Sequence, residues 1–272
     1  MLLKHNAKFK PNLDGNVGSH SNSYTRLMGE LQFIANATRP DIAYAVSKLS
    51  SYTANPSMQH VTMLKRVLQY LSGTRLYRIT YHNILGHPNQ FFGYADASFT
   101  NADDLKSTTG YVFKMSRGAI TWYSKKQTVT ALLTMKAEYI ALSEAMWEVC
   151  WLRNLFRELG FAQTLLTTIF SDNEGSIAIS KNPQFHKRAK HIGTQFHSVK
   201  EQVQEGVVTI KSIRSQQQTT DVLTKPLPWL KHKQHVGASA KKNLLTTALQ
   251  DLYLAVALQL PYRMVHKALQ GM

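Results

Sequence analysis

Apolar residues recur at helical spacing in the first part of the chain, between residues 24 and 73. The run Thr38-Arg39-Pro40-Asp41 is typical of a helix start, because threonine can cap a helix, proline suits the first turn and a carboxylate favours the positive helix end. Asn55-Pro56-Ser57 then separates two helical stretches. Their apolar stripes are Ile42, Val46 and Leu49, and Leu64, Val67, Leu68 and Leu71. We therefore expect a small helical segment over residues 23–76, after a polar lead-in over residues 1–22.

From residue 77 onwards the pattern changes to the alternation of apolar and polar residues that is typical of β-strands. Strands are predicted over residues 78–82, 90–95, 109–115, 118–124, 167–170 and 207–213. Helices are predicted over residues 134–159, 173–180, 186–205 and 219–224. Gly160 stands where a helix C-terminal glycine belongs. Antiparallel strands followed by alternating helices and strands indicate an α/β domain over residues 77–230, a mixed sheet with helices on its faces.

Composition narrows the class of protein. The 272 residues include 32 Lys and Arg against 16 Asp and Glu, a formal net charge of +16, and 43% of them are hydrophobic. That hydrophobic share is enough for a packed core, and the charge favours a polyanionic partner, nucleic acid ahead of a membrane surface. Because Cys150 is the one cysteine, we expect neither an internal disulfide nor a cysteine-based zinc site.

We recognise no targeting signal and no membrane-spanning segment in the sequence. The N-terminus lacks the apolar core and the cleavage site of a signal peptide. The longest apolar run, residues 252–258, is far short of the roughly 20 residues that span a bilayer. We expect an intracellular protein without a membrane partner, in the cytoplasm or the nucleus. Residues 231–272 form a basic tail, either an added helix or read-through into flanking sequence.

Four carboxylates stand out, because a chain so poor in acids places them at or near the ends of predicted elements. Asp96 ends an aromatic strand, Glu138 lies in the first turns of the long helix, Asp172 follows a short strand, and Asp221 begins the last helix. If the fold brings them together, they repel one another unless a divalent cation neutralises them, and hard oxygen ligands suit Mg²⁺. The alternative is that each is an ordinary helix cap or a solvated acid.

Two groups of basic residues are candidates for contacts with phosphate. One group is the run over residues 181–200, which holds five Lys and Arg and no acid. The candidates are Lys187, Arg188 and Lys190 in that run, and Lys125 and Lys126 after a strand. A solvated helix face and a turn are the respective alternatives. His186, His191 and His197 do not predict zinc, because steps of five and six residues do not align on a helix.

Several short motifs follow one another along the chain. They are Gly93-Tyr94-Ala95-Asp96-Ala97-Ser98-Phe99, Lys106-Ser107-Thr108-Thr109-Gly110-Tyr111-Val112-Phe113, Trp122-Tyr123-Ser124-Lys125-Lys126-Gln127, Ala137-Glu138-Tyr139, Ser171-Asp172-Asn173, Lys190-His191-Ile192 and Asp221-Val222-Leu223-Thr224-Lys225-Pro226-Leu227. In order and spacing they resemble the ribonuclease H domain of copia-type LTR-retrotransposon Pol polyproteins. Upstream, residues 38–47 and 65–71 resemble the segment that joins reverse transcriptase to that domain. The resemblance covers about residues 24 to 230.

This resemblance implies the ribonuclease H fold, an α/β fold with a mixed five-stranded sheet and flanking helices, here preceded by the small helical segment. It implies that Asp96, Glu138, Asp172 and Asp221 are catalytic residues that bind two Mg²⁺ ions, for which Mn²⁺ can substitute. Asp96 would bridge both metals, with Glu138 and Asp172 on one and Asp221 on the other. The reaction implied is endonucleolytic hydrolysis of the RNA strand of RNA–DNA hybrids, within a retrotransposon polyprotein.

Two features support an alternative. Lys136 stands just before Ala137-Glu138, where the family usually has an acid, and would weaken metal binding if it pointed into the acidic cluster. The paired aspartates of a reverse transcriptase palm domain are also missing, because Asp103-Asp104 lies inside the ribonuclease H match. The alternative is a catalytically inactive nucleic-acid-binding remnant of a truncated retrotransposon, or a chain that folds only against a reverse transcriptase surface. The direction of Lys136 distinguishes the active form from the inactive one.

Overall fold

The computed structural model describes residues 12, 21–82, 90–98, 106–128, 134–181, 199 and 201–237. The chain divides into two units, Met1–Lys241 and Lys242–Met272, and all described residues belong to the first. Most of the predicted lead-in and of the predicted tail therefore lies outside the described residues. So do Lys187, Arg188 and Lys190, and most of the helix predicted over residues 186–205.

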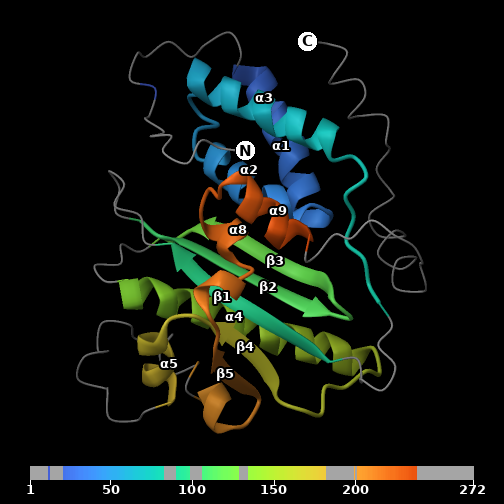
Figure 1. Cartoon of the computed structure of the whole chain (residues 1–272), viewed down its shortest axis with the longest axis vertical. Helices are drawn as coiled ribbons and strands as arrows, with labels where there is room; N and C mark the ends of the chain where they lie inside the picture. Colours follow the sequence, from blue (N-terminus) through green and yellow to red (C-terminus); the bar gives the residue numbers. More distant parts are fainter. Residues whose placement is uncertain are drawn as a thin grey trace. The chain divides into compact units, whose positions relative to one another are not determined.

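Helices make up the N-terminal part of the described chain (Figure 1). They are α1 (Ser21–Ala37), the 3-10 turn η1 (Pro40–Ile42), α2 (Ala43–Ser50) and α3 (Met58–Gly73). A capping box begins α3, in which the Ser57 amide donates to Nδ1 of His60 at 2.9 Å. The buried Tyr24 of α1 donates its hydroxyl to the Leu49 carbonyl of α2 at 2.9 Å. The helices predicted from the apolar stripes are thus confirmed.

The start of η1 differs from the prediction. The Thr38 hydroxyl donates back to the Ile34 carbonyl of α1 at 3.4 Å, and no side chain caps η1. Instead Arg39 and Asp41, both buried, form a two-pronged ion pair with N–O distances of 2.9 and 2.8 Å. The prediction of a Thr38 cap is wrong because η1 begins one residue later, after Arg39, and the Thr38 hydroxyl is engaged with the end of α1.

In the described residues, one mixed sheet has the strand order β3-β2-β1-β4-β5. Its strands are β1 (Phe91–Ser98), β2 (Thr108–Met115), β3 (Gly118–Lys126), β4 (Thr167–Ser171) and β5 (Val208–Ser212). Neighbours among β1, β2 and β3 are antiparallel, whereas β4 is parallel to both β1 and β5. The β2–β3 hairpin is tight because Ser116 and Arg117 adopt φ values of 50° and 68°, which suit the twist of a hairpin. The predicted five-stranded ribonuclease H-like sheet is confirmed.

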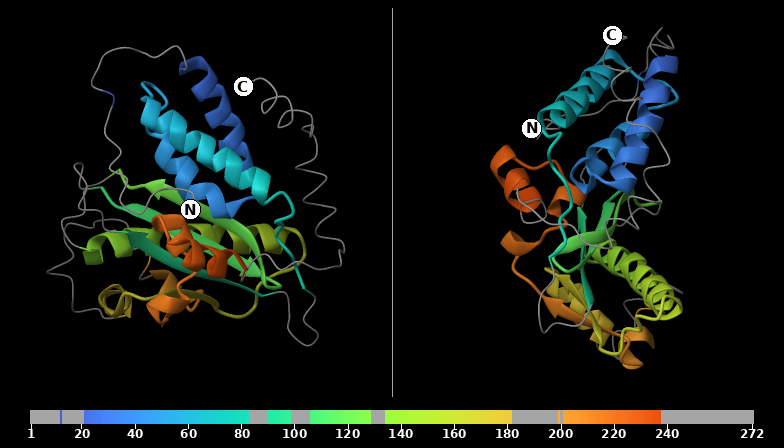
Figure 2. Two further views of the ribbon diagram at one scale, coloured as in Figure 1. Left: turned by 45° about the horizontal axis from the view of Figure 1, so that its top comes forward. Right: turned by 90° about the vertical axis from the view of Figure 1, so that its right-hand side faces the viewer.

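Helices cover both faces of this sheet (Figure 2). The helix α4 (Thr134–Glu158) packs a face that includes Tyr139, Met146 and Val149 onto β1 and β2, and Gly160 follows it with the predicted positive φ of +81°. On the other face, Leu223 packs with Ala43 of α2 and with β2 and β3. The remaining elements are α5 (Glu174–Lys181), η3 (Ser215–Gln217), α8 (Asp221–Thr224) and α9 (Trp229–Gly237).

The strand predicted over residues 78–82 is wrong. This segment has no strand pairing, although the His82 amide donates to the Ser116 carbonyl at 2.8 Å. The Tyr81 hydroxyl donates to the Ala119 carbonyl at 2.7 Å, and the Tyr81 ring lies where a Cβ on Gly118 would stand. The alternating side chains therefore reflect a segment that crosses the hairpin turn rather than one that pairs along a strand.

Candidate metal centre

Asp96 lies near the end of the central strand β1 and is 3% exposed. It pairs with Gly110 of β2, and a Cβ on Gly110 would lie 2.6 Å from Cγ2 of Thr224. Because Gly110 has no side chain, α8 can approach the sheet closely at this point. As a result, the buried Thr224 hydroxyl donates to Oδ2 of Asp96 at 2.6 Å. One carboxylate of the site is thus held by a helix that follows it by more than a hundred residues.

Glu138 lies in the second turn of α4, where Oε2 accepts the Ala97 amide of β1 at 3.0 Å. Gln127, directly after β3, is 4% exposed. Its Nε2 donates to the Ala137 carbonyl at 2.9 Å and to the Thr109 hydroxyl at 3.0 Å. These bonds fix the first turns of α4 over the sheet. Sequence reasoning quoted Gln127 within a motif but missed this role, for which the sequence offers no separate signal.

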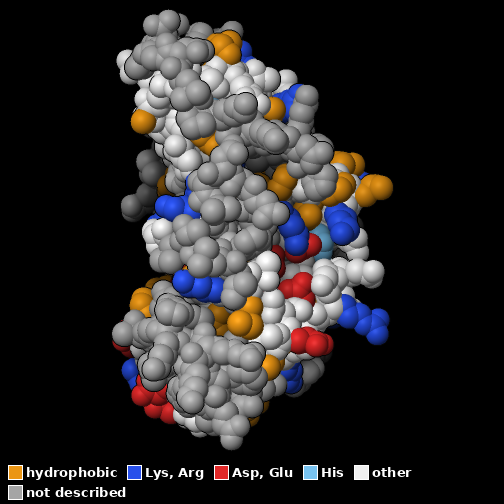
Figure 3. Space-filling view, turned by 90° about the vertical axis from the view of Figure 1, so that its left-hand side faces the viewer, with side chains coloured by type: hydrophobic (Ala, Val, Ile, Leu, Met, Phe, Trp, Pro, Cys, Tyr) orange, Lys and Arg blue, Asp and Glu red, His pale blue; other side chains and the backbone are white. Residues whose placement is uncertain are grey.

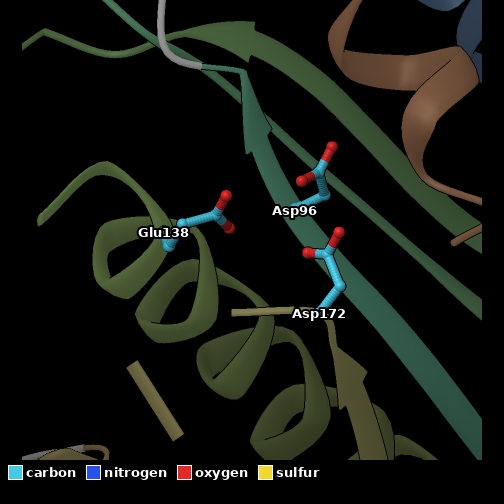
Figure 4. Close-up of side chains that lie close together, drawn as sticks. All are labelled: Asp96, Glu138 and Asp172. Carbon is cyan, nitrogen blue, oxygen red and sulfur yellow. The ribbon is translucent and has the colours of Figure 1, made fainter. Parts of the chain in front are cut away.

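Asp172 follows β4 directly, and Asn173 stands just before α5, where its Oδ1 accepts the Ser176 amide at 2.9 Å. Since β1 and β4 are parallel, their carboxyl ends meet at one edge of the sheet. Asp96, Glu138 and Asp172 each have one carboxylate oxygen that lies within 4.8 Å of those of the other two. Figure 4 shows the three side chains directed toward a common space from β1, from α4 and from the end of β4.

Asp221 is not in this group of three, although its charge contributes to the raised pKa of Asp96. It begins α8, is 7% exposed, and its Oδ1 forms an ion pair with Nζ of Lys225 at 2.7 Å. Among the described residues, no ion pair joins Lys136 to an acid of the site, and the cation whose charge acts on Asp96 and Glu138 is Lys225. In the space-filling view, Asp and Glu side chains lie at the surface with Lys and Arg side chains beside them (Figure 3).

Two carboxylates of the site, those of Asp96 and Glu138, have raised pKa values. Burial raises the pKa of Asp96 to about 6, although Lys225 and the Thr224 hydrogen bond oppose the rise. Burial, followed by repulsion from Asp96 and Asp172, raises the pKa of Glu138 to about 9. The negative charge of the cluster is therefore not balanced by the protein alone. An oxygen-only ligand set with excess negative charge is what a hard divalent cation prefers.

The described basic candidates lie at the end of β3. Lys125 is exposed and Lys126 is partly exposed. Burial and then the charge of Lys48 lower the pKa of Lys126, so this strand end faces a lysine of α2. In the described part of the chain, no helix combines the length and the apolar character needed to cross a membrane.

The strand order, its mixed pairing and the helices on both faces define a ribonuclease H-like α/β fold. No protein-family model matches the chain. The Pol polyproteins of transposon RE1 from Arabidopsis thaliana and of transposon TNT 1-94 from Nicotiana tabacum are each 37% identical to it over 75% of its length. The chain belongs to this family, the Pol polyproteins of copia-type retrotransposons. It spans 14% and 15% of the length of these two relatives.

Two further proteins are similar to shorter parts of this chain, and the match spans most of their own length. The secreted RxLR effector protein 161 of Plasmopara viticola is 38% identical over 47% of this chain and 90% of its own length. Among solved structures, LC11-RNase H1 in complex with an RNA/DNA hybrid matches with a TM-score of 0.36 and 15% identity, over 50% of this chain and 94% of that one.

Proposed function

We propose that this chain is a Mg²⁺-dependent ribonuclease that cleaves the RNA strand of RNA–DNA hybrids internally, as part of a retrotransposon polyprotein. The observation that carries the proposal is the convergence of Asp96, Glu138 and Asp172 from three separate elements. Membership of the Pol family and the ribonuclease H-like sheet support it. The proposal includes a boundary near residue 77 between the helical segment and the ribonuclease H domain, a location inside the cell, and a reverse transcriptase palm domain as partner.

The residues present suit a divalent cation. Asp96, Glu138 and Asp172 offer only oxygen atoms, and the rise in the pKa of Asp96 and Glu138 marks negative charge that a cation would neutralise. We propose these three residues as ligands, with Asp221 as the fourth once it separates from Lys225. Two ions, Mg²⁺ or Mn²⁺, would activate water for attack on phosphorus and neutralise the charge that develops on the phosphate.

The contribution of the protein is to hold these ligands in place. Thr224 directs the Asp96 carboxylate, and the Ala97 amide directs that of Glu138. Because both bonds come from groups that are themselves fixed by the fold, the ligands need little rearrangement when a cation arrives. Lys225 supplies positive charge to the metal-free cluster.

Phosphate contacts are proposed for Lys125 and Lys126 at the end of β3, and for Lys187, Arg188 and Lys190. Binding through such contacts falls steeply as salt rises, because each contact releases a counterion. The alternative function, an inactive nucleic-acid-binding remnant, depended on Lys136 facing the acids. Among the described residues no ion pair joins Lys136 to these acids, so they give this alternative no support through Lys136. Lys225 pairs with Asp221 instead, and a metal ion that used Asp221 would have to displace it.

The test compares substrates. The purified full chain is incubated in Mg²⁺ with an end-labelled RNA strand, either paired with DNA, paired with RNA or single-stranded, and with the matching DNA duplex. Internal cleavage of RNA in the hybrid alone, which EDTA stops, is the expected result. Equal cleavage of single-stranded RNA, or cleavage that persists in EDTA, would refute the proposal.

A further inference from the structure

The Thr38-Arg39-Pro40-Asp41 motif has no part in the proposed hydrolysis, yet its two charged side chains are buried, with Arg39 8% and Asp41 7% exposed. A buried ion pair is tolerated when further hydrogen bonds satisfy both partners. Here the guanidinium also donates to the Thr74 hydroxyl at 2.6 Å and to its carbonyl at 3.3 Å. The Tyr70 hydroxyl donates to Oδ2 of Asp41 at 2.7 Å. These bonds tie η1 to the end of α3.

The helix α9 contacts Asp41 and Tyr70 as well. The buried His232 donates from Nε2 to the Asp41 carbonyl at 3.1 Å, and its ring meets that of Tyr70 edge-on, with centroids 5.6 Å apart. Trp229 stacks on His232 and lies edge-on to Tyr70. We call Arg39, Asp41, Tyr70, Thr74 and His232 the Arg39–Asp41 clamp. Because α9 follows α8 closely in sequence, the clamp fixes the chain just beyond the helix that carries Asp221.

The helical segment also covers α8 directly. Leu223 is 1% exposed and packs with Ala43 of α2 on one side and with Val112 of β2 on the other. The Ser124 hydroxyl of β3 donates to the Leu223 carbonyl at 2.6 Å. The next residue, Thr224, donates to Asp96. The position of α8 therefore sets the position of one proposed metal ligand.

We propose that the helical segment, α1 to α3, supports the candidate metal centre. In this proposal Asp41 and Tyr70 are positioning residues that hold α8 against Asp96. The role given to Asp96 rests on the proposed function, but the placement of α8 does not. Loss of the clamp loosens α8, whereas the amides of β4 and β5, at the other edge of the sheet, stay protected from hydrogen exchange.

The test uses the full chain and two matched variants. Tyr70→Phe removes the hydroxyl that donates to Asp41 and keeps the ring. Tyr24→Phe removes a buried tyrosine hydroxyl of the same segment, which donates to Leu49 within the α1–α2 pair. Amide hydrogen exchange is measured without metal for peptides that cover residues 218–225 and for peptides of β4 and β5. The Tm is then measured with increasing Mg²⁺.

In Tyr70→Phe we expect exchange in residues 218–225 to be roughly tenfold faster or more, because a bond to a charged group is lost. The Mg²⁺ concentration that produces half of the maximal rise in Tm should also be higher for this variant than for the unmodified chain. Tyr24→Phe should leave both quantities as in the unmodified chain. Equal exchange of α8 in the two variants would overturn the inference. If Mg²⁺ stabilises none of the proteins, the metal proposal fails, and the exchange result still decides whether the clamp holds α8.

Discussion

Gly110→Ala should displace α8 and weaken the candidate metal centre. A Cβ at this position would lie 2.6 Å from Cγ2 of Thr224 and 3.0 Å from Cβ of Leu223. Carbon atoms that are not bonded do not approach so closely, so α8 has to move away from β2. The movement stretches or breaks the 2.6 Å hydrogen bond from Thr224 to Asp96.

Two costs set the size of the effect. Overpacking a closely packed site costs about 1–3 kcal/mol, and losing a buried hydrogen bond to a charged group costs about 1.5–3 kcal/mol. We therefore expect the free energy of unfolding to fall by about 2.5–6 kcal/mol. For a chain of this size, where about 1 kcal/mol corresponds to 2–4 °C, the Tm should fall by roughly 5–24 °C.

The assay is thermal unfolding followed by circular dichroism, in a double-mutant cycle with Thr224→Ser. Serine removes the methyl group that clashes and keeps the hydroxyl that binds Asp96, so Gly110→Ala should cost at least about 1 kcal/mol less in that background. Gly29→Ala in α1 is the control, because an added Cβ there meets nothing within 4 Å and alanine favours a helix. Additive effects of the two substitutions, or a Tm for Gly110→Ala within about 1 °C of the unmodified chain, would refute the reasoning.

Two further predictions concern charge in the metal-free site. In EDTA the Tm should fall as the pH rises from about 5 to 9, because Asp96 and Glu138, with pKa values of about 6 and 9, keep protons that the unfolded chain has released. Glu138→Gln should flatten this dependence of the Tm on pH. A Tm that rises with pH over the same range would contradict the prediction. Lys225→Met should lower the Tm in EDTA and enlarge the rise that Mg²⁺ produces, whereas Lys211→Met, at an exposed position of β5, should do neither. Identical shifts in the two lysine variants would show that Lys225 does not balance the acids.

The placement of the three acids at or near element ends could be predicted from the sequence, whereas their convergence was implied only by the resemblance to the family. Asp96 and Asp172 stand at the ends of strands that turn out to be parallel neighbours, so their side chains meet at one edge. Glu138 lies one turn into a helix whose apolar face packs on β1 and β2. Local patterns are sufficient to place an acid at the end of an element, but which strands become parallel neighbours depends on contacts between distant residues.

The contacts that hold the site could not be predicted, because they join residues far apart in the chain. The bond from Thr224 to Asp96 and those from Gln127 to Thr109 and Ala137 depend on tertiary packing. The sequence directed attention to Lys136 because it is next but one to Glu138, while the ion pair at the site comes from Lys225, the residue that follows α8. Alternation over residues 78–82 failed for a related reason, because an extended segment becomes a strand only when a neighbour pairs with it.

The most direct test of the central claim is cleavage of the RNA strand of an RNA–DNA hybrid in Mg²⁺ and in Mn²⁺ by the full chain, beside Asp96→Asn. Binding of the same hybrid is measured at low and high salt, and folding of both proteins is checked by circular dichroism. We expect cleavage that Asp96→Asn abolishes while salt-sensitive binding is retained. A folded chain that binds the hybrid and does not cleave it with either metal would contradict the account and leave a binding remnant.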